Sequence, residues 1–154
     1  MQWDGAPQAG FTTGLPWLPV SQTVPTVNVQ QASGDPSSLF QLYRRLIRLR
    51  KSMPALLHGA YVPCECDHQD VVVFLRRDER EDGSGHQVLT AVNFSGHQTV
   101  CSVPAVRSEG TILLSPYARQ NQQISWHRGR LDLQPDEAVV VELKPEPVHL
   151  LPNG

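Results

Sequence analysis

The second half of the sequence is a succession of short apolar segments, and this pattern restricts the fold more than any other feature. Gly, Pro and charged residues separate the segments. Short strands at close spacing are typical of antiparallel β-sandwiches. The expected strands are residues 60–62, 70–76, 87–94, 98–103, 111–114 and 138–143, with a hairpin over 123–133 that turns at His127-Arg128-Gly129. We therefore predict a mainly β chain with a C-terminal antiparallel β-sandwich.

One clear helix precedes these strands. Asp35 is suited to be its N-cap, because a carboxylate accepts hydrogen bonds from the free N–H groups of a first turn, and Pro36 fits the first helical position. The sequence predicts an amphipathic helix over residues 36–53, ended by Pro54, with one buried face. The apolar positions that follow the helical spacing are Leu39, Leu42, Tyr43, Leu46, Ile47, Leu49 and Met53.

Two other segments have simple local predictions. Residues 23–31 read as extended, although Pro25 argues against a central strand. Residues 71–75 form a continuous apolar run, which is typical of a strand buried on both faces.

The first nineteen residues have neither helical nor strand periodicity. Prolines and glycines recur through them, so they cannot form a continuous helix or strand. Two indoles, Trp3 and Trp17, lie in this coil, and large aromatic rings favour burial. We expect the coil either to wrap over a core or to form a loop at a functional site.

The coil contains the motifs Met1-Gln2-Trp3-Asp4, Ala9-Gly10-Phe11-Thr12 and Pro16-Trp17-Leu18-Pro19-Val20. Further along are Val27-Asn28-Val29, Asp35-Pro36-Ser37-Ser38-Leu39, Tyr43-Arg44, Leu46-Ile47, Leu49-Arg50, Pro54-Ala55-Leu56, Gly59-Ala60-Tyr61 and Asn93-Phe94-Ser95. Together they resemble glycoside hydrolase family 13, in its α-glucosidase and oligo-1,6-glucosidase branch. The resemblance covers about the first 95 residues, and the remainder agrees only as a pattern of strands.

The resemblance implies that the chain is the C-terminal portion of a larger enzyme and begins in the loop after the last barrel strand. Residues 1–58 would then be a remnant of a (β/α)8 barrel, made of that loop and the helix over residues 36–53. Residues 59–144 would be the C-terminal β-sandwich, and residues 145–154 a disordered tail. The rest of the barrel would be absent, so the helix would lack its usual partner strands.

Retaining glycoside hydrolysis uses a pair of carboxyl groups about 5–5.5 Å apart. The resemblance places the family's nucleophile, acid/base and stabilising carboxylates upstream of Met1, so we expect no catalytic residue in this chain. The positions of the acidic residues in the sequence support this expectation. Asp78, Glu79, Glu81 and Asp82 are predicted to lie in a solvated turn, and Asp136-Glu137 precedes a strand. By resemblance, Gln2, Trp3 and Asp4 would lie at the substrate rim of the parent enzyme. The alternative is that Trp3 and Trp17 only pack the coil onto the barrel.

Cys64, Cys66 and His68 are closely spaced residues of the types that bind zinc. Zinc sites usually combine two separated ligand pairs, and no second pair is present. We therefore expect no metal site. The alternative is that these residues simply belong to a hairpin of variable sequence. Cys101 falls on an expected strand and reads as a small buried hydrophobe.

Bulk properties exclude several classes of partner. A formal net charge of −2 gives no electrostatic reason to expect nucleic acid or an anionic membrane surface. No signal peptide or membrane span is visible in the sequence. The three cysteines are an odd number, which fits reduced thiols in the cytoplasm.

The leading hypothesis is thus a C-terminal part of a retaining α-glucosidase that acts on terminal α-linked glucose of oligosaccharides, without an organic cofactor and inactive alone. The missing barrel would be its partner. The alternative is a free-standing carbohydrate-binding or interaction module, for which only Tyr117 and Trp126 look free to form an aromatic platform. A third possibility, the hydrolase-like subunit of amino-acid transporters, needs an anchor helix that the sequence does not show.

Overall fold

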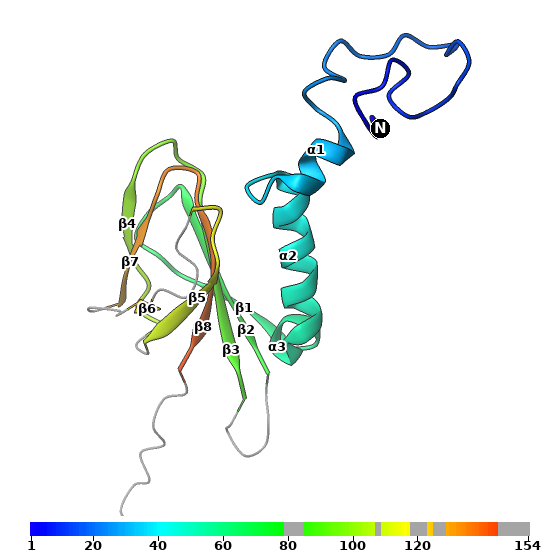
Figure 1. Cartoon of the computed structure of the whole chain (residues 1–154). Helices are drawn as coiled ribbons and strands as arrows, with labels where there is room; N and C mark the ends of the chain where they lie inside the picture. The colour runs from blue at the N-terminus through cyan, green and yellow to red at the C-terminus, as the bar shows by residue number, and fades with distance from the viewer. Residues whose placement is uncertain (79–84, 107–108, 118–122, 125–128, 145–154) are drawn as a thin grey trace, which may run out of the picture. The chain divides into compact units, whose positions relative to one another are not determined.

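A computed structural model describes residues 1–78, 85–106, 109–117, 123–124 and 129–144 (Figure 1). The chain forms two compact units, Met1–Arg48 and Leu49–Gly154. The first contains the N-terminal coil and most of the helical residues, and the second contains every described strand. The predicted limits after residues 58 and 144 stay predictions, and residues 145–154 lie outside the described part of the chain.

The helices are α1 (Val29–Gly34), α2 (Leu39–Ser52) and α3 (Pro54–Leu57). The extended prediction for residues 23–31 is wrong, because residues 22–26 form turns and α1 begins at Val29. The Thr26 and Val27 N–H groups both donate to the Thr23 carbonyl. Asn28 is the N-cap of α1: its side-chain oxygen accepts from the Gln31 N–H at 2.9 Å, and its amide donates to the Val24 carbonyl at 2.8 Å. An asparagine in this position supplies the cap that starts a helix.

Helix α2 starts three residues later than expected. Asp35 ends α1 instead, and its carboxylate accepts from the Ser37 N–H and hydroxyl at 2.8 and 2.7 Å. The Ser38 hydroxyl then accepts from the Gln41 N–H at 3.2 Å, so a serine takes the capping position predicted for Asp35. Helix α2 contains no buried residue, in agreement with the expectation that its apolar face lacks its usual partner strands.

The strands are β1 (Ala60–Cys64), β2 (Val71–Arg77), β3 (Gln87–Asn93), β4 (Thr99–Ser102), β5 (Gly110–Leu114), β6 (Gln123–Ile124), β7 (Arg130–Leu133) and β8 (Ala138–Leu143). Within the described residues, one sheet has the order β1-β2-β3-β8-β5-β6 and the other consists of β4 and β7. Every pairing is antiparallel. The expected mainly β, antiparallel fold class is confirmed.

Two strand predictions need correction. The hairpin over residues 123–133 does not form, because β6 pairs with β5 in one sheet and β7 pairs with β4 in the other. Its expected turn at His127 and Arg128 lies outside the described residues. Strand β2 is not buried on both faces: Val71, Val73 and Leu75 are buried, whereas Val72 between them is exposed. The alternation follows from a sheet that has one face on the core.

The core lies between the two sheets (Figure 1). Alternate residues of the larger sheet meet those of β4 and β7, and Cys101 is fully buried among them as predicted. The members are Val71, Val73, Leu75, Leu89, Ala91, Cys101, Val103, Val106, Ile112, Leu131, Leu133, Val139, Val141 and Leu143. At about 1.5–3 kcal/mol for each fully buried large aliphatic side chain, this cluster is the main stabilising element of the second unit.

Polar groups close one end of this core. Asn93 is buried, and its amide donates to the carbonyls of His97 and Gln134 at 2.8 and 2.9 Å. Glu137 is also fully buried and accepts from the Ser115 hydroxyl at 2.6 Å and from the Gln134 N–H at 2.8 Å. Buried polar groups satisfied in this way fix the position of the connections between strands.

Among the helices that the structure describes, none is both long and apolar enough to cross a membrane.

Candidate functional site

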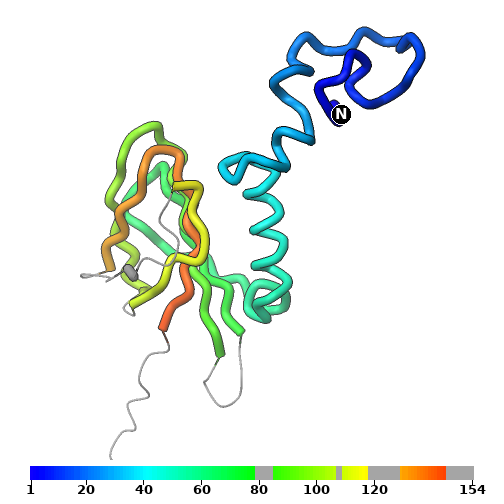
Figure 2. Tube along the Cα trace, viewed as in Figure 1, coloured from blue at the N-terminus to red at the C-terminus, as the bar shows by residue number. Residues whose placement is uncertain are grey.

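The N-terminal coil has a defined fold of its own (Figure 2). The Trp3 N–H donates to the Ala9 carbonyl at 2.9 Å, and the Ala9 N–H donates to the Ala6 carbonyl at 2.8 Å. Ala9 and Gly10 both have positive φ, at 54° and 72°. A Cβ on Gly10 would also lie 2.9 Å from a carboxylate oxygen of Asp4, so this position requires glycine.

The start of the coil is attached to α1. The carbonyls of Gln2 and Trp3 accept from the Val29 and Gln30 N–H groups, each at 2.9 Å. These are the first N–H groups of the helix, which have no partner within it. The Gln2 side-chain amide also donates to the Val27 carbonyl, just ahead of the helix. Residues far apart in sequence are thereby joined into one loop structure.

The three predicted rim residues lie in one turn, and their side chains have different surroundings. The Gln2 amide is engaged with the Val27 carbonyl. The Asp4 carboxylate accepts from the Ala6 N–H at 2.9 Å, within the turn itself. The Trp3 indole is 49% exposed. Of the three, Trp3 offers the largest surface to a ligand, while Gln2 and Asp4 hold the turn in shape.

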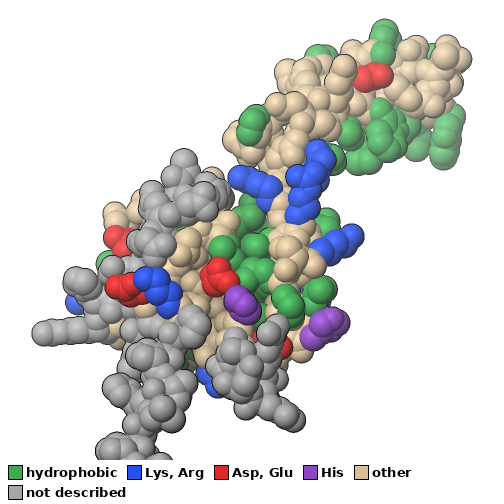
Figure 3. All heavy atoms as spheres, turned by 60° about the horizontal axis from the view of Figure 1, so that its bottom comes forward, with side chains coloured by type: hydrophobic (Ala, Val, Ile, Leu, Met, Phe, Trp, Pro, Cys, Tyr) green, Lys and Arg blue, Asp and Glu red, His purple; other side chains and the backbone are tan. Residues whose placement is uncertain are grey.

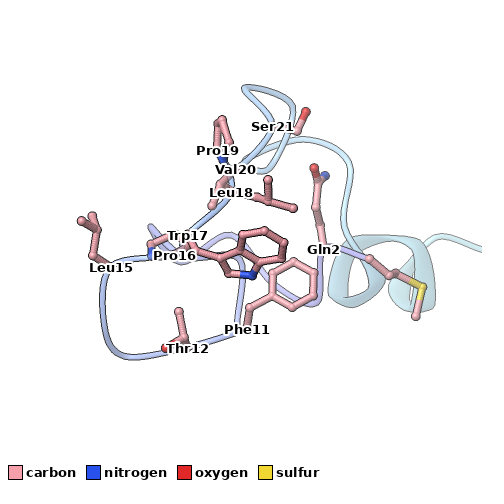
Figure 4. A pocket seen from close by; sticks show the side chains of 11 residues that line it. Gln2, Phe11, Thr12, Leu15, Pro16, Trp17, Leu18, Pro19, Val20 and Ser21 are labelled. Carbon is pink, nitrogen blue, oxygen red and sulfur yellow. The ribbon is translucent and has the colours of Figure 1, made fainter.

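A cavity of about 680 Å³ lies beside this turn (Figure 4). It is mainly apolar, and it includes Gln2 but neither Trp3 nor Asp4. Its largest side chain, Trp17, is 91% exposed, so the packing expected for this indole is not made within the described chain. The lining residues are Met1, Gln2, Phe11, Thr12, Leu15, Pro16, Trp17, Leu18, Pro19, Val20 and Ser21.

Large apolar side chains are unusually exposed throughout the first unit. Hydrophobic groups gather along one side of the coil in the space-filling view (Figure 3). Apolar surface of this extent marks an interaction site. The motifs and the helical spacing already pointed to Phe11, the two indoles and several apolar positions of α2, whereas Leu15 and Phe40 carry no such signal. The exposed members are Met1, Trp3, Phe11, Leu15, Trp17, Leu18, Val27, Leu39, Phe40, Tyr43 and Ile47.

Several described acidic side chains have structural partners. Glu142 pairs with His86 at 3.0 Å. Glu109 pairs with Lys144 at 2.5 Å, and the hydrogen bond and positive charge of that lysine lower the pKa of the carboxyl group. Hydrogen bonds from Ser37 likewise lower the pKa of Asp35. These contacts stabilise the ionised form of Asp35 and Glu109 and provide no proton donor for catalysis near neutral pH.

The cysteine-histidine segment follows β1. Cys64 ends that strand, and the Cys66 thiol donates to the Val71 carbonyl at 3.2 Å. Within the described residues no group of three or more His, Cys, Asp or Glu side chains is arranged to hold a metal ion.

Three described aromatic residues of the second unit, Tyr117, Tyr61 and Phe74, have partners within that unit. The Tyr117 hydroxyl donates to the Pro135 carbonyl at 2.7 Å, which ties this ring to the loop before β8. Trp126 lies outside the described residues. Tyr61 and Phe74 form a pair with ring centroids 5.1 Å apart, but their planes are tilted by 39°.

The chain is similar to known proteins along most of its length. Residues 1–59 match the family described as alpha amylase, catalytic domain. The oligo-1,6-glucosidase of Halalkalibacterium halodurans is 40% identical over 119 residues, covering 76% of this chain and 20% of that protein. The oligo-1,6-glucosidase of Bacillus cereus is 32% identical over 146 residues, covering 94% of this chain and 25% of that protein.

The resemblance to glycoside hydrolase family 13 is confirmed. Solved structures of enzymes similar to this chain extend the match through the sheets. The trehalulose synthase of Pseudomonas mesoacidophila superimposes with a TM-score of 0.74 at 30% identity, covering 93% of this chain and 24% of the enzyme. The trehalose-6-phosphate hydrolase of Bacillus licheniformis gives 0.73 at 28% identity, covering 92% and 25%. The chain thus spans about a fifth to a quarter of the length of its family 13 relatives.

Proposed function

We propose that this chain forms the C-terminal part of a retaining α-glucosidase that acts on terminal α-linked glucose of oligosaccharides. The observation that carries the proposal is the position of the match: residues 1–59 correspond to part of a catalytic domain, and the similarity to family 13 enzymes continues through the β-sandwich. The oligo-1,6-glucosidases among the relatives favour an α-glucoside as substrate.

The chain alone should be inactive as a hydrolase. A retaining enzyme needs two carboxyl groups across the scissile bond, about 5–5.5 Å apart. Asp4 lies in the turn beside the cavity of the first unit, and its carboxylate is engaged with the Ala6 N–H. The buried Glu137 is engaged with Ser115, in the second unit. These placements support a catalytic pair supplied by the upstream part of the enzyme.

The partner of the first unit is then the rest of the catalytic domain. A surface that exposes Trp17, Leu15 and Tyr43 is costly in water and is stabilised when other apolar side chains cover it. We infer that the upstream barrel covers the cavity side of the coil and the apolar positions of α2. We further infer a cytoplasmic location, because Cys64, Cys66 and Cys101 are all free thiols.

Gln2, Trp3 and Asp4 form the substrate rim in this proposal. Trp3 contacts the sugar through its exposed indole, because an aromatic face packs well against an apolar surface of the ligand. Gln2 and Asp4 act as positioning residues, through their contacts with Val27 and Ala6.

A chimeric enzyme tests the rim directly. This chain replaces the matching quarter of the Bacillus cereus oligo-1,6-glucosidase, and hydrolysis of isomaltose-type and maltose-type oligosaccharides is measured. We expect an active chimera in which Trp3→Ala raises KM about tenfold, equivalent to about 1.4 kcal/mol of lost binding.

Trp17→Ala is the matched control, because it removes an equally large side chain from the same coil. We expect it to lower the stability of the chimera and to leave KM unchanged, since Trp17 is assigned to the barrel contact. A folded chimera without activity would contradict the proposed function. An active chimera whose KM is insensitive to Trp3→Ala would contradict the rim assignment alone.

A further inference from the structure

Two cysteines meet where the connection between β1 and β2 lies against β4. The Asp67 N–H donates to the Ser102 carbonyl at 3.4 Å, and the Ser102 N–H donates to the Asp67 carboxylate at 2.6 Å. Cys66 and Cys101 each precede one member of this pair. The two hydrogen bonds therefore hold the cysteine-bearing segments of the two sheets side by side.

The two thiols lie close together but differ in their access to solvent. Cys101 is fully buried, and Cys66 is near enough to contribute to the raised pKa of the Cys101 thiol. Cys66 is only partly buried, packs against the core cluster that contains Cys101, and donates to the Val71 carbonyl. One thiol is thus open to a reagent from solution, and the other is held behind it.

Burial raises the pKa of the Cys101 thiol to about 11, with additional contributions from Cys66 and from the negative charge of Asp67. At neutral pH Cys101 therefore stays protonated and unreactive toward external reagents. It can still react once Cys66 has been modified, because the mixed disulfide is then held beside it and the reaction is intramolecular.

We propose that Cys66 and Cys101 form an oxidative cross-linking site, at which a small-molecule disulfide converts the two thiols into one internal disulfide between the sheets. The Cys66 thiolate attacks the external disulfide and releases one small thiolate. The Cys101 sulfur then attacks the mixed disulfide, its proton passes to solvent or to the leaving sulfur, and the second small thiol departs. Two protein thiols are oxidised and one external disulfide is reduced to two thiols.

The bond would stabilise the second unit. It closes a loop of about 36 residues and thereby reduces the conformational entropy of the unfolded chain. We expect the oxidised protein to melt on the order of 10 °C above the reduced protein.

The test treats the folded full chain with oxidised glutathione, blocks remaining thiols with an alkylating reagent, and maps disulfides by mass spectrometry without reduction. The expected product has lost two hydrogen atoms, joins the peptides of Cys66 and Cys101, and retains an alkylated Cys64. Cys64→Ser is the matched control and should cross-link normally. Cys66→Ser should abolish the product.

Because Cys101 is part of the core, Cys101→Ala is checked first for a cooperative melting transition and should then stop at the mixed disulfide on Cys66. A wild-type protein that also stops at this mixed disulfide would overturn the proposal, as would a bridge that contains Cys64. An unchanged melting temperature of the cross-linked protein would overturn the stabilising role.

Discussion

We expect Glu137→Ala to lower the free energy of unfolding of the second unit by about 3 kcal/mol. The Glu137 carboxylate is fully buried and accepts from the Ser115 hydroxyl and the Gln134 N–H. Alanine removes the acceptor of both donors, and a buried donor deprived of its acceptor costs roughly 1–3 kcal/mol. Denaturant titration of the purified chain measures the loss.

Glu142→Ala is the matched control for this experiment. Glu142 lies on the same strand, β8, but it is partly exposed and pairs with His86 at the surface. Exposed pairs of this kind contribute about 0–1 kcal/mol. Equal losses for the two alanine variants would contradict the assignment of Glu137 to the structural network. Glu137→Gln keeps one acceptor oxygen and should fall between wild type and Glu137→Ala.

We expect Gly59→Ala to destabilise the second unit by a similar amount, about 3 kcal/mol. A Cβ at this position would overlap the Ala55 carbonyl oxygen and lie 2.8 Å from the Arg77 carbonyl oxygen. Both obstacles are backbone atoms, so no side-chain rotation relieves the overlap, and α3 or the start of β1 must move. Thermal or denaturant unfolding measures the change.

Gly96 provides the matched comparison. A Cβ on Gly96 meets no atom within 4 Å, and its φ is not positive. Gly96→Ala should therefore change stability by no more than about 0.5 kcal/mol, or raise it slightly through the unfolded state. If Gly59→Ala were as harmless as Gly96→Ala, the close approach of α3 to β2 would be wrong.

The strands and their fold class were predictable because apolar alternation and turn residues are local signals. Pairing was harder: nothing local distinguishes a β6–β7 hairpin from two strands that belong to different sheets, as they do here. The same holds for the capping of α1 and α2. Asp35 satisfies the sequence rule for an N-cap, yet Asn28 and Ser38 take these positions. Their side chains also donate to carbonyls outside the helix that each one caps, those of Val24 and Ala32.

The candidate site was likewise predictable in part. Motifs identified the coil around Gln2, Trp3 and Asp4, but spacing alone could not reveal that Gln2 binds the Val27 carbonyl while Trp3 stays exposed. The apolar face of α2 was predictable from its amphipathic spacing, but spacing does not say which segment covers that face, and α2 contains no buried residue.

The most direct test of the central claim is the rate at which the purified chain alone hydrolyses an aryl α-glucoside, measured beside the chimeric enzyme. The account predicts no rate above that of buffer for the chain and ready turnover for the chimera. Turnover that follows the isolated chain through purification and is lost on Asp4→Asn would contradict it, since the chain would then contain a catalytic carboxylate of its own.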